Sequence, residues 1–190
     1  MKKILSLITV VLFSVSTFAQ LVLKNDPAHS RIQFAVMHLG INDITGNFDK
    51  AALTINADEK NFANSTLAFS ADVNSINTHV EARDNHLKSA DFFDAAKFST
   101  LDFKSTSLTK NKKNYYTLKG NLTMHGVTKP VTLTLVYRGS TVNAMNKKTT
   151  YGYQVLGTLK RSDFNVGPKF PAPMITDLVR IKGDFELTAE

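Results

Sequence analysis

Apolar and polar residues alternate along most of the chain from Leu21 onward. Ile32, Phe34 and Val36, for example, alternate with Arg31 and Gln33. Alternation with period two is typical of β-strands that have one apolar face. The same pattern recurs in residues 67–73, 101–103, 116–124, 131–137, 153–159 and 181–187, with a further candidate strand in residues 47–57. We therefore predict about eight strands, and the short Gly-, Asn- or Lys-containing turns between most of them favour antiparallel neighbours.

One segment, about residues 79–93, breaks this alternation and is typical of a helix. Thr78 and Glu81 have the spacing of a capping box, in which the hydroxyl accepts from the third helical N–H and the carboxylate reaches back to the cap. The segment ends on an apolar pair, Phe92 and Phe93. A helix this short cannot bury its apolar end alone, so we expect it to cap one end of the strand assembly.

Two architectures would bury the apolar faces of these strands: a sandwich of two sheets, or a barrel that closes on itself and leaves no edge. Several strands are long, and Gly120, Gly157 and Gly183 fall on the apolar face, where a missing side chain permits coiling and leaves room inside. Both features favour the barrel. The prediction is an all-β fold, an eight-stranded antiparallel barrel with one short helix at its end, and such a barrel can hold a small ligand.

The N-terminus has the pattern of a secretory signal peptide. Two lysines follow the initiator methionine, residues 4–18 form an almost uninterrupted apolar run, and Ala19 completes a small-residue cleavage site. The run is about 15 residues, shorter than the roughly 20 that a spanning helix needs. We expect residues 1–19 to be removed and residues 20–190 to form a single domain that is periplasmic or secreted, without stable membrane insertion.

Composition narrows the classes of partner. Without the two leader lysines, 21 of the 23 basic side chains remain against 16 acidic ones, a formal net charge of +5. The lysines gather only in loop-like stretches such as residues 110–113 and 147–148, without interleaved aromatic residues, which argues against a nucleic-acid surface. The chain has no cysteine, so disulfides, thiol chemistry and thiolate metal sites are excluded.

Six blocks of residues, in order along the chain, resemble the signature blocks of one family. They are residues 26–30 (Asp-Pro-Ala-His-Ser), 34–40 (Phe-Ala-Val-Met-His-Leu-Gly), 46–48 (Gly-Asn-Phe), 83–87 (Arg-Asp-Asn-His-Leu), 90–94 (Ala-Asp-Phe-Phe-Asp) and 122–130 (Leu-Thr-Met-His-Gly-Val-Thr-Lys-Pro). They make the chain similar to the YceI family of bacterial periplasmic proteins. The resemblance implies a lipocalin-like barrel whose apolar interior holds a long isoprenoid or other lipid chain, and no established enzymatic activity. The chain departs from the family pattern in having no Trp, and in Asn165 where the family usually has Gly.

The resemblance also implies that the apolar strand faces line a lipid tunnel, whereas alternation alone favours an ordinary packed core. The predicted lining residues are Phe34, Val36, Phe69, Phe103, Tyr116, Leu118, Leu133, Leu135, Tyr137, Tyr153, Val155 and Phe185. Burial of a lipid chain gains roughly 0.8 kcal/mol per CH₂ removed from water, so such a wall can bind without polar anchors. We expect no cofactor, and as ligand a long-chain isoprenoid, a quinone or a fatty amphiphile.

Candidates for contact with a lipid head group at the barrel mouth are His38, Arg83, His86, Phe92, Phe164, Phe170 and Met174. Arg83 has two interpretations: it pairs internally with Asp91 or Asp94, which is the commoner fate of an arginine, or it meets a phosphate or carbonyl head group. Residues 163–176 contain three prolines and are predicted to form a long loop. That loop either covers the tunnel mouth or is pinned to the barrel exterior.

Two other functions stay open from the residues alone. The first is a metal-dependent or hydrolytic enzyme that uses the five histidines, His29, His38, His79, His86 and His125. No HExxH or similar short spacing occurs, and His79 and His86 would lie about 10 Å apart along a helix, so we expect no metal site and no catalysis. The second is a stress-related interaction module with a packed, ligand-free barrel. The patterns leave open whether the chain forms a homodimer.

Overall fold

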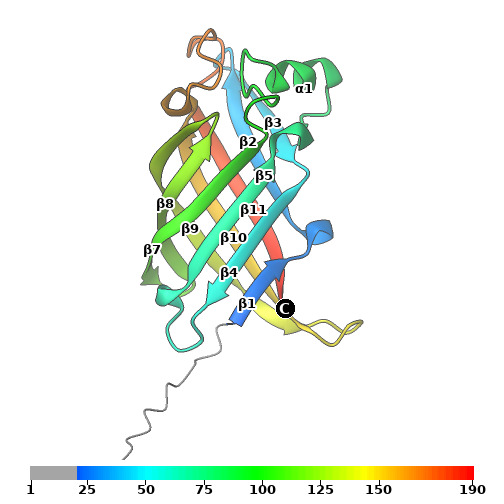
Figure 1. The fold of residues 1–190 in the computed structure, drawn as a ribbon, viewed down its shortest axis with the longest axis vertical. Helices are drawn as coiled ribbons and strands as arrows, with labels where there is room; N and C mark the ends of the chain where they lie inside the picture. The colour runs from blue at the N-terminus through cyan, green and yellow to red at the C-terminus, as the bar shows by residue number, and fades with distance from the viewer. Residues whose placement is uncertain (1–20) are drawn as a thin grey trace, which may run out of the picture.

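The computed structural model describes residues 21–190, which form strands, one α-helix and short 3-10 helices (Figure 1). The strands are β1 (Leu21–Asn25), β2 (Arg31–His38), β3 (Asn42–Phe48), β4 (Ala51–Ala57), β5 (Thr66–Asp72), β6 (Ile76–Asn77), β7 (Thr100–Lys112), β8 (Tyr115–Met124), β9 (Val127–Val142), β10 (Thr149–Lys160) and β11 (Leu178–Ala189). The helix is α1 (Glu81–Lys88), and the 3-10 helices are η1 (Pro27–His29), η2 (Phe62–Asn64), η3 (Val73–Ser75) and η4 (Arg161–Phe164). The expected signal peptide, residues 1–19, lies outside the described residues.

Eight antiparallel strands close into a barrel. The strands pair in the order β1, β4, β5, β7, β8, β9, β10 and β11, and β11 pairs back with β1. Leu23 of β1 makes the closure, because it lies opposite Ile55 of β4 on one side and Ala189 of β11 on the other. The predicted eight-stranded antiparallel barrel is therefore confirmed, and no exposed edge remains where these strands meet.

The other three strands, β2, β3 and β6, extend the wall at the upper end, where α1 lies in Figure 1. β2 pairs with the upper part of β11, β3 pairs with β2, and β6 pairs with β3. The predicted single strand over residues 47–57 is in fact two, since the chain turns at Asp49 and Lys50. Their backbone N–H groups donate to the carbonyl and hydroxyl oxygens of Ser75, at 3.1 and 3.0 Å, instead of to a ladder.

The helix is shorter than predicted and begins differently. α1 starts at Glu81, and its N-cap residue, Val80, makes no side-chain cap hydrogen bond, so the predicted capping box is wrong. The N–H and hydroxyl of Thr78 instead donate to Oδ1 of Asp84, at 2.8 and 2.5 Å. His79 has a φ of 61° and lies outside the helix. The Asp84 carboxylate, in the first turn of α1, and the backbone reversal at His79 therefore fix the path of the chain into the helix.

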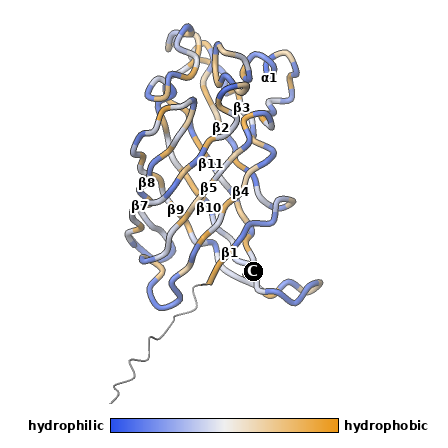
Figure 2. Tube along the Cα trace, in the orientation of Figure 1, coloured by the Kyte–Doolittle hydropathy of each residue, from blue (hydrophilic) through white to orange (hydrophobic). Residues whose placement is uncertain are grey.

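At each of the strand glycines Gly120, Gly157 and Gly183, an inward-facing side chain takes up the space that a Cβ atom would occupy. A Cβ atom on each would overlap an inward-facing neighbour, so each glycine lets that neighbour lie flat against the wall. The pairs are Gly120 with Phe103 Cζ (2.4 Å), Gly157 with Leu133 Cδ2 (2.3 Å) and Gly183 with Phe185 Cε2 (2.5 Å). Hydropathy alternates along the strands as predicted (Figure 2). Among residues 21–190, no helix has the length and apolar character required to cross a membrane.

Candidate functional site

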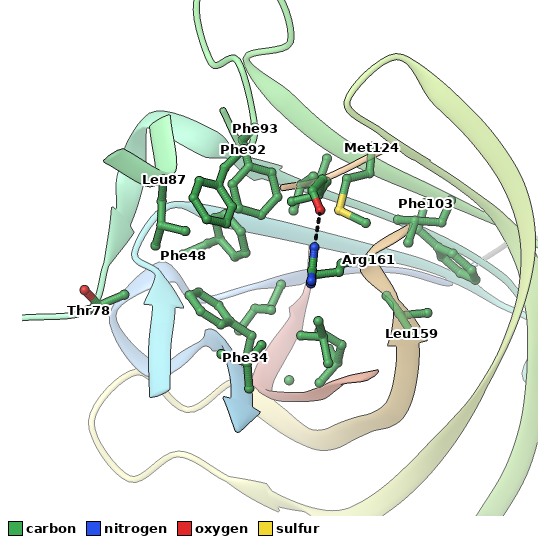
Figure 3. A pocket seen from close by; sticks show the side chains of 18 of the residues that line it. Phe34, Phe48, Thr78, Leu87, Phe92, Phe93, Phe103, Met124, Leu159 and Arg161 are labelled. Atoms are coloured by element: carbon green, nitrogen blue, oxygen red, sulfur yellow. Dashed lines mark hydrogen bonds between the residues drawn. The ribbon is translucent and has the colours of Figure 1, made fainter. Parts of the chain in front are cut away.

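The upper half of the barrel encloses a cavity of about 400 Å³. Its wall is formed by inward-facing side chains of β2, β3, β4, β5 and β7 to β11, and it is completed above by residues of the α1 region and of the loop after η4. Figure 3 shows Phe34, Phe48, Phe92 and Phe93 together on one side of the cavity and Phe103 on the other. The wall is overwhelmingly apolar, and its size is typical of small-molecule sites. A fully packed barrel, one of the open alternatives, is therefore wrong.

Most of the predicted lining residues lie on this wall. They are Phe34, Val36, Phe69, Phe103, Leu118, Leu133, Val155 and Phe185. The structure places the others below the cavity: Tyr116, Leu135, Tyr137 and Tyr153. Alternation correctly identifies the inward face of a strand but carries no information about depth along the barrel. Tyr153 is the next inward residue below Val155 on β10, and it belongs to the packed lower half.

The lower half is closed by aromatic side chains. Phe62, from the loop between β4 and β5, makes an edge contact with Tyr116 at a centroid distance of 5.3 Å and stacks on Tyr153 at 5.7 Å. Tyr137 lies against Tyr153 at 5.3 Å, and Leu135 is completely buried beside them. Burial raises the pKa of the Tyr153 hydroxyl above its ordinary value, with a further contribution from the neighbouring tyrosines. The cavity consequently ends blind within the barrel.

The predicted mouth residues lie at the upper end of the cavity, with one exception. His38, Arg83, His86, Phe92, Phe170 and Met174 line it. Phe164, the last residue of η4, does not, because its side chain is buried in the core and only 1% exposed. The predicted long loop over residues 163–176 contains no strand, and its residues Phe170, Met174 and Ile175 contribute to the cavity wall. The loop therefore covers the mouth and is not pinned to the exterior.

An aromatic and ionic cluster, called the mouth cluster below, joins this loop to the segment after α1. It consists of His86, Asp91, Phe92, Lys169 and Phe170. The ring of His86 meets the rings of Phe92 and Phe170 edge-on, at 5.0 and 5.5 Å between centroids. Lys169 Nζ lies 2.7 Å from Asp91 Oδ1, and His86 Nε2 lies 3.5 Å from Asp91 Oδ2. The Lys169 ammonium, through its hydrogen bond and its charge, holds the pKa of the Asp91 carboxyl below its ordinary value. These contacts hold the loop over the mouth.

Arg83 lines the cavity but does not form the predicted ion pair. Its Nε donates to Thr78 Oγ1 at 2.8 Å, and its Nη2 donates to the Thr78 carbonyl at 2.9 Å. Asp91 pairs with Lys169 as above, while Asp94 pairs with Lys97 at 2.9 Å. The predicted pairing of Arg83 with either aspartate is therefore wrong. Thr78 links Arg83 to Asp84, which places a cationic group on the wall of a largely apolar cavity.

Arg161 is a site residue that sequence reasoning missed. Only 7% of it is exposed, and it lies on the cavity wall at the start of η4 (Figure 3). Its guanidinium donates to five backbone carbonyls of the loop, namely those of Val166 (3.0 Å), Gly167 (2.7 Å), Ile175 (3.2 Å), Thr176 (3.2 Å) and Phe170. Burial lowers the pKa of Arg161. An arginine that precedes a loop has no distinctive spacing, so no sequence signal could have identified this role.

The histidines do not come together. His29 lies 2.8 Å from Asp26 on the outside of the barrel, and His125 Nδ1 lies 3.2 Å from the carbonyl of Phe164. His86 belongs to the mouth cluster, whereas His79 lines a separate polar surface depression beside α1. Within residues 21–190, no group of three or more His, Asp or Glu side chains could hold a metal ion.

Comparisons with known proteins identify the family. Residues 23–187 match the family model of the YceI-like domain. The chain is 37% identical over 169 residues to the UPF0312 protein SA2479 of Staphylococcus aureus (strain N315), across 87% of this chain and 94% of that one. The crystal structure of Burkholderia cenocepacia BcnA has a TM-score of 0.77 at 22% identity, covering 85% of this chain and 98% of that chain.

A second solved structure is described as a polyisoprenoid binding domain from Saccharophagus degradans implicated in plant cell wall breakdown. It has a TM-score of 0.69 at 15% identity, covering 90% of this chain and all of that one (100%). At these identities the two structures bear on the fold, and both agree with the barrel described above. The family match spans nearly the whole barrel, from β1 to β11. The chain therefore belongs to the YceI-like domain family.

Proposed function

We propose that this protein binds an amphiphilic lipid with a long apolar chain, such as a polyisoprenoid or a quinone, and sequesters or carries it in the barrel. The observation that carries this proposal is the cavity itself, about 400 Å³ in volume, apolar on nearly all sides and closed at its lower end. The similarity in fold to a protein described as a polyisoprenoid binding domain supports the choice of ligand class.

The chemistry of the wall fits an apolar chain better than a polar metabolite. Each CH₂ group that leaves water for such a wall gains roughly 0.8 kcal/mol, and the gain needs no directional contact. A sugar or nucleotide would instead lose its hydrogen bonds to water without finding partners along the strands. This difference in the free energy of burial favours a lipid over a polar metabolite as the ligand. More than one lipid could be bound, because apolar chains of several kinds would fit the wall.

The polar end of the ligand belongs at the upper end of the cavity. The polar and charged side chains on the wall are His38, Thr78, Arg83, His86 and Arg161, and they come from the upper end of β2, the α1 region and the start of η4. A phosphate or carbonyl head group placed there would meet Arg83 and His86 while the chain points down the barrel. The sequence-based candidates for head-group contact, other than the buried Phe164, stay in this role as part of the proposal.

We further propose that the protein acts outside the cytoplasm, in the periplasm or after secretion. The proposal rests on the leader-like pattern of residues 1–19. Cell fractionation followed by N-terminal sequencing tests it, with a new N-terminus close to Gln20 expected in the extracytoplasmic fraction. Recovery of the uncleaved chain in the cytoplasm would overturn it.

Ligand binding is tested by native mass spectrometry of protein purified without detergent, followed by organic extraction. We expect a co-purifying amphiphile, or uptake of an added prenyl alcohol or quinone. Val155→Trp, which fills the cavity from β10, should abolish the bound mass, whereas Val142→Trp at an exposed position of β9 should not. Equal binding by the two variants, or no uptake of any amphiphile by the wild-type protein, would overturn the proposal.

A further inference from the structure

The cavity extends over only part of the barrel. On β11, the inward residues Val179, Ile181, Gly183 and Phe185 line it, whereas the next one, Leu187, is fully buried in the core. At a rise of about 3.3 Å per residue, the lined stretch is about 20 Å of strand. The same boundary occurs on β8 and β10, where Leu118 and Val155 line the cavity but the residues two positions below them do not.

The residues immediately below this boundary are aromatic. Tyr116 is the next inward residue below Leu118 on β8, and Tyr153 is the next one below Val155 on β10. Because β8 and β10 flank β9, the two rings point into the barrel from the two strands on either side of β9. Phe62 packs against both rings, with centroid distances of 5.3 Å to Tyr116 and 5.7 Å to Tyr153. Three interlocked rings thus separate the cavity from the lower end of the barrel.

Phe62 is presented by an ordered turn at the lower end of the barrel (Figure 1). Asp58 accepts hydrogen bonds from the N–H groups of Lys60 and Asn61, at 2.9 and 3.0 Å, and from the side-chain amide of Asn64 at 3.2 Å. Asn61 caps η2 by accepting from the N–H of Ala63 at 3.2 Å. This network fixes the backbone on both sides of Phe62 and so holds the ring inside the barrel.

We propose that Phe62, Tyr116 and Tyr153 form a floor that sets the longest apolar chain the protein can enclose. The inference rests on the proposed lipid-binding function and adds a length limit to it. A chain that reaches the floor gains nothing from further carbons, since these must stay in water at the mouth or force closely packed rings apart. The floor therefore makes the protein selective among ligands that share a head group and differ in length.

The test compares Tyr153→Val with Tyr115→Val. Both replace a tyrosine by a strand-compatible residue at the lower end of the barrel, but Tyr115 lies on the outer face of β8 and is 38% exposed. The probes are farnesol, geranylgeraniol and solanesol, and the measurement is displacement of a fluorescent fatty acid. For the wild-type protein we expect affinity to rise with chain length and then stop rising or fall.

Tyr153→Val should move that limit to a longer alcohol, with the first alcohol beyond the wild-type limit bound about tenfold tighter than by the wild-type protein. Tyr115→Val should keep the wild-type limit. Phe62→Ala, which removes the ring that packs against Tyr116 and Tyr153, should also move the limit to a longer alcohol. This second variant tests the length limit if Tyr153→Val does not fold. An unchanged limit in a folded floor variant would overturn the inference but not the proposed function. Failure of the wild-type protein to bind any of the alcohols would overturn both.

Discussion

The ring of Phe92 stacks on the ring of Phe170, with centroids 4.6 Å apart and an angle of 13° between their planes. Phe92 follows α1, and Phe170 belongs to the loop after η4, so the contact joins two segments that are distant in the sequence. Both rings also line the upper end of the cavity. The same pair therefore stabilises the cover of the mouth and forms part of the surface that a ligand would pass.

Phe170→Ala should loosen this cover without opening the barrel. Loss of the stacked ring and of its edge contact with His86 is expected to lower the free energy of unfolding by about 1–2 kcal/mol. Because the mouth is less well covered, a bound prenyl alcohol should dissociate faster, which stopped-flow displacement measures. Met145→Ala, in the exposed turn between β9 and β10, is the control and should change neither quantity. Unchanged dissociation in Phe170→Ala would contradict the role of the loop as a cover.

Arg161 should be essential for the conformation of that loop. Replacement by Met keeps much of the aliphatic stem but leaves several buried carbonyls without donors, each at a cost of about 1–3 kcal/mol. We expect a loss of at least about 3 kcal/mol in urea unfolding, and only partial recovery with Lys, whose single ammonium cannot reach five acceptors. Arg180→Met is the control, because Arg180 is exposed and pairs with Asp43 at the surface. Similar losses in both variants would show that Arg161 has no special role.

The mouth cluster should weaken in acid. The pKa of Asp91 is lowered in the folded state, so the folded protein binds fewer protons than the unfolded chain, and stability falls as the pH falls. The contribution is fully present above the unfolded pKa of about 4 and disappears as the pH drops through the folded value. The measurement is the difference in urea midpoint between wild type and Asp91→Asn, which should shrink toward zero below about pH 4. A difference that does not vary with pH would argue against the ion pair with Lys169.

The strand glycines should differ in their tolerance of a methyl group. A Cβ at Gly120 would lie 2.4 Å from the Lys104 carbonyl oxygen, which is part of the wall and cannot move easily. At Gly157 it would meet only the end of the Leu133 side chain, which can turn into the cavity. We expect Gly120→Ala to cost more stability than Gly157→Ala, with the latter in the range of about 1–3 kcal/mol and accompanied by weaker binding of long alcohols. Thermal unfolding ranks the two, and the reverse order would contradict the explanation.

The barrel could be predicted because the pattern that specifies it lies within each strand. Period-two alternation identifies the inward face of each strand, and strand number and length then favour closure. The depth of a residue within the barrel cannot be inferred from its own strand. Val155 and Tyr153 share a face of one strand, yet only Val155 lines the cavity. What separates them is Phe62, which arrives from a loop some ninety residues away in the sequence and packs against Tyr153.

Polar contacts around the helix and the loop were less predictable. Arg83 has carboxylates at suitable spacing, but its partners are the hydroxyl and carbonyl of Thr78, because the backbone reverses at His79 before α1 begins. Arg161 binds only backbone carbonyls, and these become neighbours once the loop has folded around the guanidinium. The order of side chains in a sequence does not identify a site in which the hydrogen-bond partners are backbone carbonyls.

Strand β11 pairs with β10 along its length, with β2 at its upper part and with β1 at its lower part. The wall consequently stays open until residues 178–189 have been synthesised, whatever the earlier strands have already formed. Ribosome-bound chains that lack these residues must therefore expose their apolar faces to solvent or to a chaperone. Final closure joins segments about 160 residues apart, which places this step among the slow, topology-limited events of folding.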